Sequence, residues 1–482
     1  MPGVHRGGRR LTGVKSPRWR SEVCPRRVTR RGAGVAAAAA ADDGRSVERL
    51  VLQAASMTAT RNRTLARLAI CVLLLGPGAC GHESAPAPDR GAVPAEFQDL
   101  YGSLQATLDS FNRTLDARGS GTRTPVTFSA ELLTANANRG QQLLGSDALP
   151  GARLELDRLR ALGVRGVVFT VSFPLLYPPF HAWSHTDPAP YLAFYRQVAA
   201  EARARGLKVA IGTGPMFRGV YSAGAGFDVG AYYDQLSTDE YLFGRGEVAK
   251  AIARDLQPDF LELGGEPDSE AEISGKPVNS PFVYLTLTNY LLDQLGSVEW
   301  PGRVGVGVGS WHPLAPSFVR GYCTSSRIDF VDVHVYPISL GFLQQALSLS
   351  DTARACGKGV AISEAWLLKA RDTELRQTSN AVDPSLFARD AYGFWAPLDA
   401  SFLSTMVKLA YVTRAELLSA FWSRYFFAYL DYDTVVREGC GTPRHACAPA
   451  EVLDLASAAA ARSIVAGDYT STGRAYMGQI AP

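Results

Sequence analysis

The sequence predicts an α/β protein in which eight parallel strands close into a (β/α)8 barrel, or TIM barrel. Eight short apolar segments alternate with helical segments along residues 123–482, and polar or aromatic side chains follow nearly every segment. An open doubly wound sheet is the competing architecture, but no G-x-G-x-x-G turn follows the first apolar segment. The chain has 482 residues, 46% hydrophobic and 20% charged, which suits one large soluble domain.

The first 80 residues are typical of targeting sequence. Residues 1–56 carry 12 Lys and Arg against 4 Asp and Glu, and we interpret them as a start codon assigned too early, with disorder as the alternative. Residues 57–80 have three arginines, an apolar core and a small-residue end, as in a signal peptide. Cys80 resembles the lipidated cysteine of a bacterial lipoprotein; plain secretion is the alternative. We therefore expect an exported protein that meets the membrane only through a lipid anchor.

Charge and cysteine usage limit the other partners. Beyond residue 80 the net charge is −8, which gives no basic footprint for nucleic acid. No Cys/His set has zinc spacing, so we expect no metal or cofactor, and we expect a monomer. Four cysteines beyond the signal suggest disulfides in an exported chain. Cys440 and Cys447 are close enough to staple a loop, and Cys323 and Cys356 both precede predicted strands, at one end of the barrel.

The elements follow in order. Residues 81–94 have linker composition, and apolar residues at helical spacing over 95–117 predict an amphipathic helix within an N-terminal segment, 95–122. The predicted strands are 126–130, 166–172, 207–212, 259–264, 303–309, 328–335, 359–363 and 417–422. Helical segments such as 152–163, 191–206 and 241–256 separate them.

The strand ends carry the chemistry. All eight carboxyl ends of a parallel barrel point to one face, so residues that follow the strands should meet in one pocket. The residues in question are Glu131, Ser172, Gly214, Glu266, Trp311, His312, His334, Tyr336, Glu364 and Trp422.

Two glutamates stand out among them. Glu266 in "LELGGEPD" ends the fourth predicted strand, and Glu364 in "ISEAW" ends the seventh. A lone glutamate after a strand is usually a cap or an ion-pair partner. Two carboxyl groups about 5–5.5 Å apart across a barrel mouth suit a retaining glycosidase, in which one acts as acid/base and the other as nucleophile.

These segments resemble the clan A glycoside hydrolases, a superfamily of retaining (β/α)8 glycosidases, over roughly residues 124 to 435. The resemblance implies that Glu266 is the acid/base and Glu364 the nucleophile. "DVHVYP" resembles the strand-six motif, which implies that His334 and Tyr336 flank the nucleophile, and "SAFWSRYF" places Trp422 under the reacting sugar. A carbohydrate is the implied substrate. Glu131, Trp311, His312 and Trp366 are further candidates for binding it, and aromatic residues in the loop after the second strand could add sugar-stacking faces.

The chain departs from the clan pattern at one position. The clan usually has asparagine just before the acid/base, where it contacts the substrate 2-hydroxyl, and this chain has Gly265. Losing that contact could weaken transition-state stabilisation. Two alternatives therefore stay open: a barrel that binds carbohydrate without cleaving it, and another polysaccharide-active barrel enzyme such as a lyase.

Overall fold

The structure, a computed structural model, describes residues 93–119, 125–218, 226–375 and 384–481. Every described residue belongs to one compact unit within residues 84–482. The predicted extension, the signal peptide with Cys80 and residues 81–92 of the predicted linker lie outside the described residues. No helix in the described ranges is both long enough and apolar enough to cross a bilayer.

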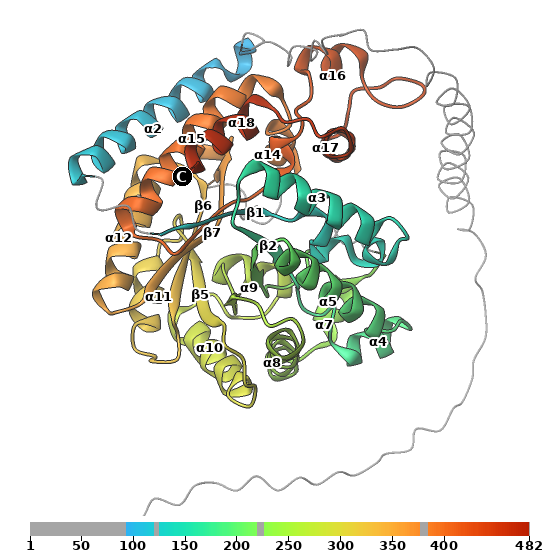
Figure 1. Ribbon diagram of the computed structural model, residues 1–482, viewed down its shortest axis with the longest axis vertical. Helices are drawn as coiled ribbons and strands as arrows, with labels where there is room; N and C mark the ends of the chain where they lie inside the picture. Colours follow the sequence, from blue (N-terminus) through green and yellow to red (C-terminus); the bar gives the residue numbers. More distant parts are fainter. Residues whose placement is uncertain (1–92, 120–124, 219–225, 376–383, 482) are drawn as a thin grey trace, which may run out of the picture. The chain divides into compact units, whose positions relative to one another are not determined.

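Eight parallel strands close into a barrel in chain order, with β8 paired to β1, which confirms the predicted fold (Figure 1). The strands are β1 (Thr127–Glu131), β2 (Gly166–Thr170), β3 (Lys208–Gly212), β4 (Phe260–Glu262), β5 (Arg303–Gly309), β6 (Phe330–Pro337), β7 (Gly359–Leu368) and β8 (Leu417–Ala420).

Six strands differ from their predicted bounds at the carboxyl end, and three of these differences affect the candidate site. β4 stops at Glu262, two residues before the predicted end, ahead of the Gly264–Gly265 pair. β6 and β7 run on to residues 337 and 368, and the pairing of β7 with β8 shifts register between Ile362 and Ala365. Glu364 therefore lies at an irregularity inside β7 and not at its end. Such bulges commonly redirect a side chain next to an active site.

Helices surround the barrel on its outer side (Figure 1). The α-helices are α2 (Gln98–Arg118), α3 (Ala148–Leu162), α4 (Pro178–Ser184), α5 (Ala189–Ala204), α7 (Val229–Gln235), α8 (Thr238–Asp255), α9 (Pro267–Ser274), α10 (Pro281–Leu295), α11 (Ala315–Tyr322), α12 (Leu340–Ala355), α13 (Asp372–Leu375), α14 (Pro384–Arg389), α15 (Ala396–Thr413), α16 (Tyr432–Glu438), α17 (Pro449–Ala466) and α18 (Ser471–Ile480). The 3-10 helices are η1 (Ala95–Phe97), η2 (Leu133–Ala135), η3 (Ala137–Leu144), η4 (Gly393–Trp395) and η5 (Ser423–Phe426).

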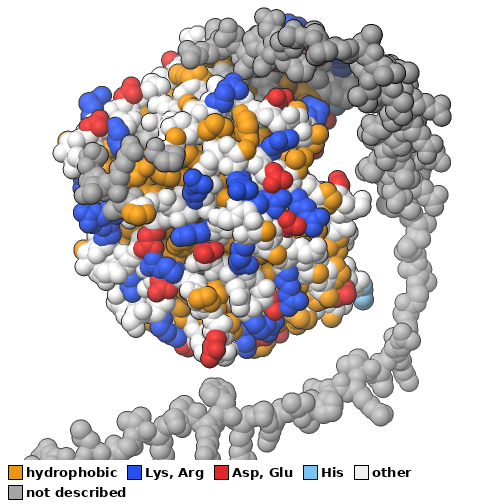
Figure 2. Space-filling view, viewed as in Figure 1, with side chains coloured by type: hydrophobic (Ala, Val, Ile, Leu, Met, Phe, Trp, Pro, Cys, Tyr) orange, Lys and Arg blue, Asp and Glu red, His pale blue; other side chains and the backbone are white. Residues whose placement is uncertain are grey.

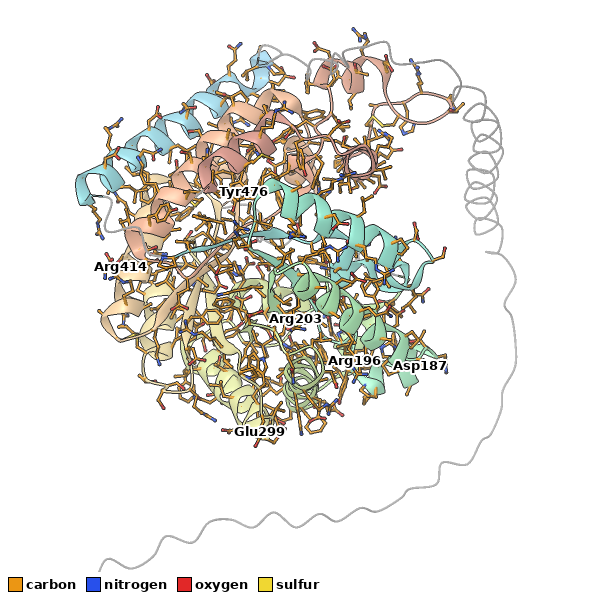
Figure 3. The ribbon with its side chains drawn as sticks, viewed as in Figure 1. Asp187, Arg196, Arg203, Glu299, Arg414 and Tyr476 are labelled. Atoms are coloured by element: carbon orange, nitrogen blue, oxygen red, sulfur yellow. A yellow bond between two sulfur atoms is a disulfide. The ribbon has the colours of Figure 1, made fainter. Side chains whose placement is uncertain are left out.

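The amphipathic helix α2 buries one apolar face against α12 and α15 (Figure 1). Its buried residues recur every three to four positions, as the sequence pattern requires: Leu100, Leu104, Leu108, Phe111 and Leu115. At the end of the chain, Tyr476 of α18 is buried and donates a hydrogen bond to the Ser129 carbonyl of β1 at 3.1 Å (Figure 3). The first and last helices thus both close the outer layer.

The barrel interior is apolar toward the amino ends of the strands and polar toward the carboxyl ends. Six side chains, one from each of six strands, form a cluster separate from the core under the helices: Val168, Ala210, Phe260, Phe330, Ala361 and Leu417. Continuing along β4 and β6 by two residues leads to buried Glu262 and Asp332, and a further two on β6 to His334. Polar groups thus begin halfway up the barrel.

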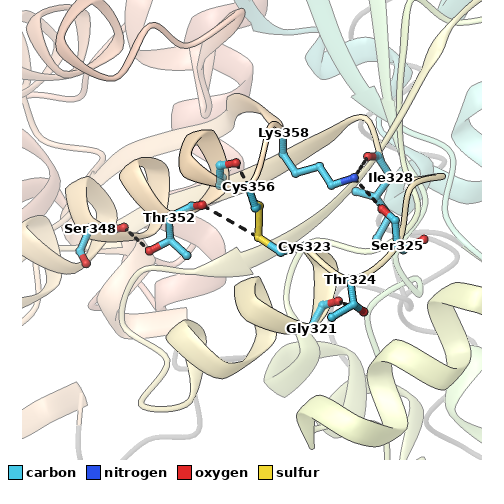
Figure 4. Close-up of a disulfide and its surroundings, with 10 residues drawn as sticks. Gly321, Cys323, Thr324, Ser325, Ile328, Ser348, Thr352, Cys356 and Lys358 are labelled. Carbon is cyan, nitrogen blue, oxygen red and sulfur yellow. Dashed lines mark hydrogen bonds between the residues drawn. A yellow bond between two sulfur atoms is a disulfide. The ribbon is translucent and has the colours of Figure 1, made fainter. Parts of the chain in front are cut away.

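Both expected disulfides are present. Cys323, after α11, is bonded to Cys356, after α12, with the Cα atoms 5.8 Å apart (Figure 4). Beside it, Lys358 donates from Nζ to the Ile328 carbonyl at 2.7 Å. Cys440 and Cys447 close the loop between α16 and α17, with a Cα separation of 5.0 Å.

Candidate active site

The residues that follow the strands line one cleft of about 580 Å³. The sequence-predicted residues in its wall are Glu131, Ser172, Gly214, Glu266, Trp311, His334, Tyr336, Glu364 and Trp422. They come from all eight strands or from the segments that follow them. The expected convergence on one face of the barrel is therefore what the structure has.

Glu266 is held by a turn that a buried ion pair supports. It caps α9, with extended backbone and Pro267 at the first helical position. Beneath the turn, buried Arg245 donates from Nη2 to the Leu263 carbonyl at 2.6 Å and pairs with buried Glu270. Glu270 in turn donates its backbone N–H to the Glu266 carbonyl at 2.8 Å. The Glu266 carboxylate is thus presented at the mouth of the barrel from a rigid support.

Glu364 is held by a hydroxyl from the neighbouring strand. The Tyr336 hydroxyl donates to Glu364 Oε2 at 2.6 Å, the contact implied by the strand-six motif. The Tyr336 ring packs edge-on against Trp311, with centroids 6.1 Å apart, and lies 5.6 Å from the Trp422 ring. Two tryptophans therefore fix the tyrosine that orients the carboxylate.

His334 lies between the carboxylates. Its Nδ1 is 3.0 Å from Glu266 Oε1 and 3.6 Å from Glu364 Oε2, and its Nε2 is 3.1 Å from Glu262 Oε1. Burial disfavours the imidazolium, but the carboxylates of Glu364 and Glu262 outweigh it and raise the pKa of His334 well above its ordinary value. We therefore treat His334 as an imidazolium that faces a carboxylate at each ring nitrogen.

The two glutamates are close enough to share one substrate atom. One carboxylate oxygen of Glu266, one of Glu364 and a ring nitrogen of His334 all lie within 4.8 Å of one another. This spacing fits the retaining geometry and is shorter than the 6.5–9.5 Å expected for inversion. Within the described ranges, this trio and Glu262–Asp332–His334 are the groups spaced so that they could hold a metal ion.

The electrostatics of the pair favour one shared proton. Burial, together with the charges of Glu266 and Glu262, raises the pKa of Glu364 to about 8, although His334 and the Tyr336 hydrogen bond act in the opposite direction. Two carboxylates this close do not both ionise easily. At neutral pH the pair therefore retains one proton.

Two further acids lie beneath the pair. Burial raises the pKa of Asp332 to about 6, and the nearby Glu262 charge adds to the effect. Asp332 Oδ1 accepts from the Ser363 backbone N–H at 2.8 Å, one residue before Glu364. Glu262 and His334 fill the space beside Gly265, where an added Cβ would lie 2.6 Å from Glu262 Oε1 and 2.9 Å from His334 Nε2. An asparagine side chain has no room there.

Glu131 acts on Trp422 through the backbone. Its Oε2 accepts the Trp422 backbone N–H at 2.9 Å and its Oε1 accepts from Asn136 at 3.1 Å, while the Ser423 hydroxyl donates to its carbonyl. Trp422 has a left-handed backbone, with φ 54°, which a tryptophan adopts only when its surroundings impose it. Both oxygens of Glu131 are thus engaged, and one of them holds the backbone of the tryptophan.

Two predicted binding residues lie away from the cleft. His312 is buried, accepts the Leu314 backbone N–H at its Nδ1 and packs edge-on against Phe318. Trp366 is fully buried and packs against Tyr425, because the β7 irregularity sends Glu364 into the cleft and Trp366 behind it. The aromatic residues after β2 also pack among themselves and their neighbours: Phe173, Tyr177, Phe180 and Trp183.

The cleft also holds residues that the sequence reasoning missed. Arg139 and Arg424 lie in its wall, on the segments after β1 and β8. Arg424 lies within "SAFWSRYF", two residues after Trp422, but was not singled out there. Arg139 is part of no quoted motif, and only its position a few residues beyond a predicted strand could have indicated it. Asp332 had a clearer signal, since it shares the parity of His334 and Tyr336 in "DVHVYP".

Comparisons with known proteins gave structural likenesses. No protein-family model and no curated protein matches the chain. An exo-β-1,4-mannosidase from Opitutaceae bacterium strain TAV5 superposes with a TM-score of 0.44 at 16% identity, over 71% of this chain and 60% of that one. The GH5_18 protein of Streptomyces cattleya, solved with GlcNAc, gives 0.44 at 16%, over 75% and 80%. A GH26 β-mannanase from Bacteroides ovatus gives 0.39 at 15%, over 67% and 85%.

Proposed function

We propose that this protein is a retaining glycoside hydrolase of the clan A type that cleaves O-glycosidic bonds of an oligo- or polysaccharide. The observation that carries the proposal is the spacing of Glu266 and Glu364, which bring one carboxylate oxygen each within 4.8 Å of the other at one barrel mouth. The cleft around them supplies the aromatic faces of Trp311 and Trp422. Such faces suit sugar rings.

The mechanism follows from the positions of the two acids. Glu364, oriented by the Tyr336 hydroxyl, attacks the anomeric carbon, while Glu266 gives its proton to the departing glycosidic oxygen. Glu266, now a carboxylate, then removes a proton from water, which attacks the glycosyl-enzyme ester and frees Glu364. His334 compensates negative charge on both carboxylates through the double displacement, because its Nδ1 faces Glu266 and Glu364 together.

Azide rescue of two alanine variants tests the assignment. With an aryl glycoside that has a good leaving group, Glu266→Ala should still form the glycosyl-enzyme but hydrolyse it slowly, because water has lost its base. Azide needs no base and should restore turnover, with a glycosyl azide of retained configuration as product. Glu364→Ala should be inactive, and any azide product should have inverted configuration. Glu299→Ala is the matched control, because Glu299 is an exposed glutamate just before β5, at the amino end of the barrel (Figure 3).

The same variants separate the alternatives. A barrel that only binds carbohydrate would show no turnover as wild type and unchanged affinity as Glu364→Ala. A lyase would release unsaturated sugars, which absorb in the ultraviolet, and would lose less activity on either change. If Glu266→Ala keeps full activity on substrates with poor leaving groups, Glu266 is a turn residue and the proposed mechanism is wrong.

A further inference from the structure

Two arginines in the cleft have guanidinium groups without a carboxylate partner in the described part of the chain. Arg139 is half-buried, and its Nε is inaccessible to solvent yet has no hydrogen-bond partner. Arg424 is half-buried and donates from Nη1 to the Ser457 hydroxyl at 3.0 Å. Most of their donors therefore remain available to a ligand, since a guanidinium carries five N–H groups.

Many other arginines of this molecule have an acidic partner. Buried Arg245 pairs with Glu270, and surface arginines such as Arg205 and Arg389 pair with acidic neighbours. On the face in Figure 2, basic and acidic side chains are intermixed over the helices. A half-buried guanidinium costs desolvation free energy, which a partner normally offsets. Two such groups in one cleft indicate that the partner arrives with the ligand.

Two acids of the same cleft, Glu131 and Asp454, form no ion pair with either arginine. Glu131 lies close enough to Arg424 for its charge to be felt, but both Glu131 oxygens already accept hydrogen bonds, from Asn136 and from the Trp422 backbone. Asp454 of α17 also lines the cleft and is exposed to solvent.

The arginines lie on one side of the reacting glutamates. Glu266 follows β4, and β4 and β8 lie opposite each other in a closed eight-stranded barrel. The leaving group must sit beside the acid/base, so the sugar attacked by Glu364 extends away from β4. That direction leads to the β8 and β1 sector, where Arg424 and Arg139 are found.

We propose that the glycone side of the cleft binds a sugar that carries a carboxylate, such as a uronic acid residue, through Arg139 and Arg424. The inference rests on the proposed glycosidase function for its direction along the cleft. Planar guanidinium groups match a carboxylate with paired N–H donors, and their charge-assisted hydrogen bonds are stronger than neutral ones. The substrate class is therefore an acidic glycan.

Binding to matched oligosaccharides tests the proposal. Glu364→Gln in the full chain prevents turnover, and calorimetry compares β-1,4-linked glucuronate with glucose oligomers, and mannuronate with mannose oligomers, of equal length. Each pair differs only at C6. We expect at least one acidic oligomer to bind roughly tenfold or more tightly than its neutral partner, and less tightly as salt is raised. Arg139→Gln and Arg424→Gln should each weaken that binding by roughly ten- to a hundredfold and leave neutral binding unchanged.

Three controls sharpen the result. Arg165→Gln removes an exposed arginine just before β2, at the opposite end of the barrel, and should change nothing. Arg424→Lys keeps the charge and should recover part of the affinity. A 6-O-sulfated glucose oligomer that binds more tightly than the glucuronate oligomer would overturn the carboxylate assignment.

The outcomes separate this inference from the proposed function. If the wild type hydrolyses neutral aryl glycosides, but no acidic oligomer is preferred or the arginine variants keep the preference, the acidic-glycan inference is wrong and the hydrolase stands. If acidic oligomers bind through the arginines and nothing is hydrolysed, the binding inference stands and the hydrolase is wrong.

Discussion

Replacing Gly265 by alanine should impair the proposed active site through a steric clash. The added Cβ would lie 2.6 Å from Glu262 Oε1, 2.9 Å from His334 Nε2 and closer still to His334 Cε1. Since side-chain atoms rarely approach within about 3.4 Å of a Cβ, the imidazole would have to move by roughly 1 Å. His334 would then lose its present spacing to Glu266 and Glu364.

The expected effects are large on activity and moderate on stability. A displacement of about 1 Å at a reacting group can lower turnover by roughly a hundredfold. Overpacking a well-filled interior costs about 1–3 kcal/mol of the free energy of unfolding. The assays are steady-state kinetics on an activated aryl glycoside and urea unfolding. Gly102→Ala is the control, because Gly102 is an exposed glycine of α2 with no described atom within 4 Å of an added Cβ.

A double-mutant cycle identifies the cause. If the clash with the imidazole dominates, Gly265→Ala should cost much less stability in a His334→Ala background, since the obstructing ring is gone. Additive effects of the two changes, or full activity of Gly265→Ala, would refute the steric explanation.

Three other predictions concern the glutamate pair and the first disulfide. For a substrate with a poor leaving group, kcat/KM should fall above pH about 8, because the pair there loses the proton that Glu266 donates. For an activated substrate kcat/KM should not fall, because the leaving group needs no proton and the nucleophile Glu364 is ionised. A pH profile that drops equally for both substrates would contradict the shared proton. Tyr336→Phe should lower kcat by roughly ten- to a hundredfold and move that alkaline limb to higher pH, because the lost hydrogen bond favoured the Glu364 carboxylate. Replacing Cys323 and Cys356 together by serine opens a loop of sequence separation 33 and should lower the free energy of unfolding by about 3–4 kcal/mol in urea titrations. Reductant should then cause no further loss from this disulfide, because the variant lacks it.

The barrel was predictable because its signals repeat. Eight apolar segments with helices between them specify parallel pairing, and a polar residue beyond each segment falls on one face whatever the loops do. An error in the end of a strand, two residues at β4 and five at β7, leaves the face unchanged. For the same reason, errors in the strand bounds did not affect the expected convergence of four residues, namely Glu266, His334, Tyr336 and Glu364.

What could not be predicted depends on contacts between distant segments. Their positions beyond predicted strands place His312 and Trp366 near the cleft. In the structure His312 instead packs on Phe318, and the β7 irregularity leaves Trp366 buried behind the cleft. Arg139 and Arg424 belong to irregular segments, where no periodicity indicates which way a side chain points. Their lack of acidic partners is a property of the assembled cleft and has no counterpart in the linear sequence.

The glycine at 265 has a physical reason that bears on the choice between hydrolase and binding protein. From sequence alone it reads as the loss of a substrate-binding asparagine, which would favour a barrel without catalysis. In the structure, the volume beside Gly265 is taken by the imidazole of His334 and the carboxylate of Glu262, which are 3.1 Å apart. Any larger residue at 265 would separate that pair, and with it the contact of His334 with Glu266. The missing side chain and the buried Glu262–His334 pair are therefore one feature, so the glycine is no evidence that the proposed acid/base has lost its surroundings.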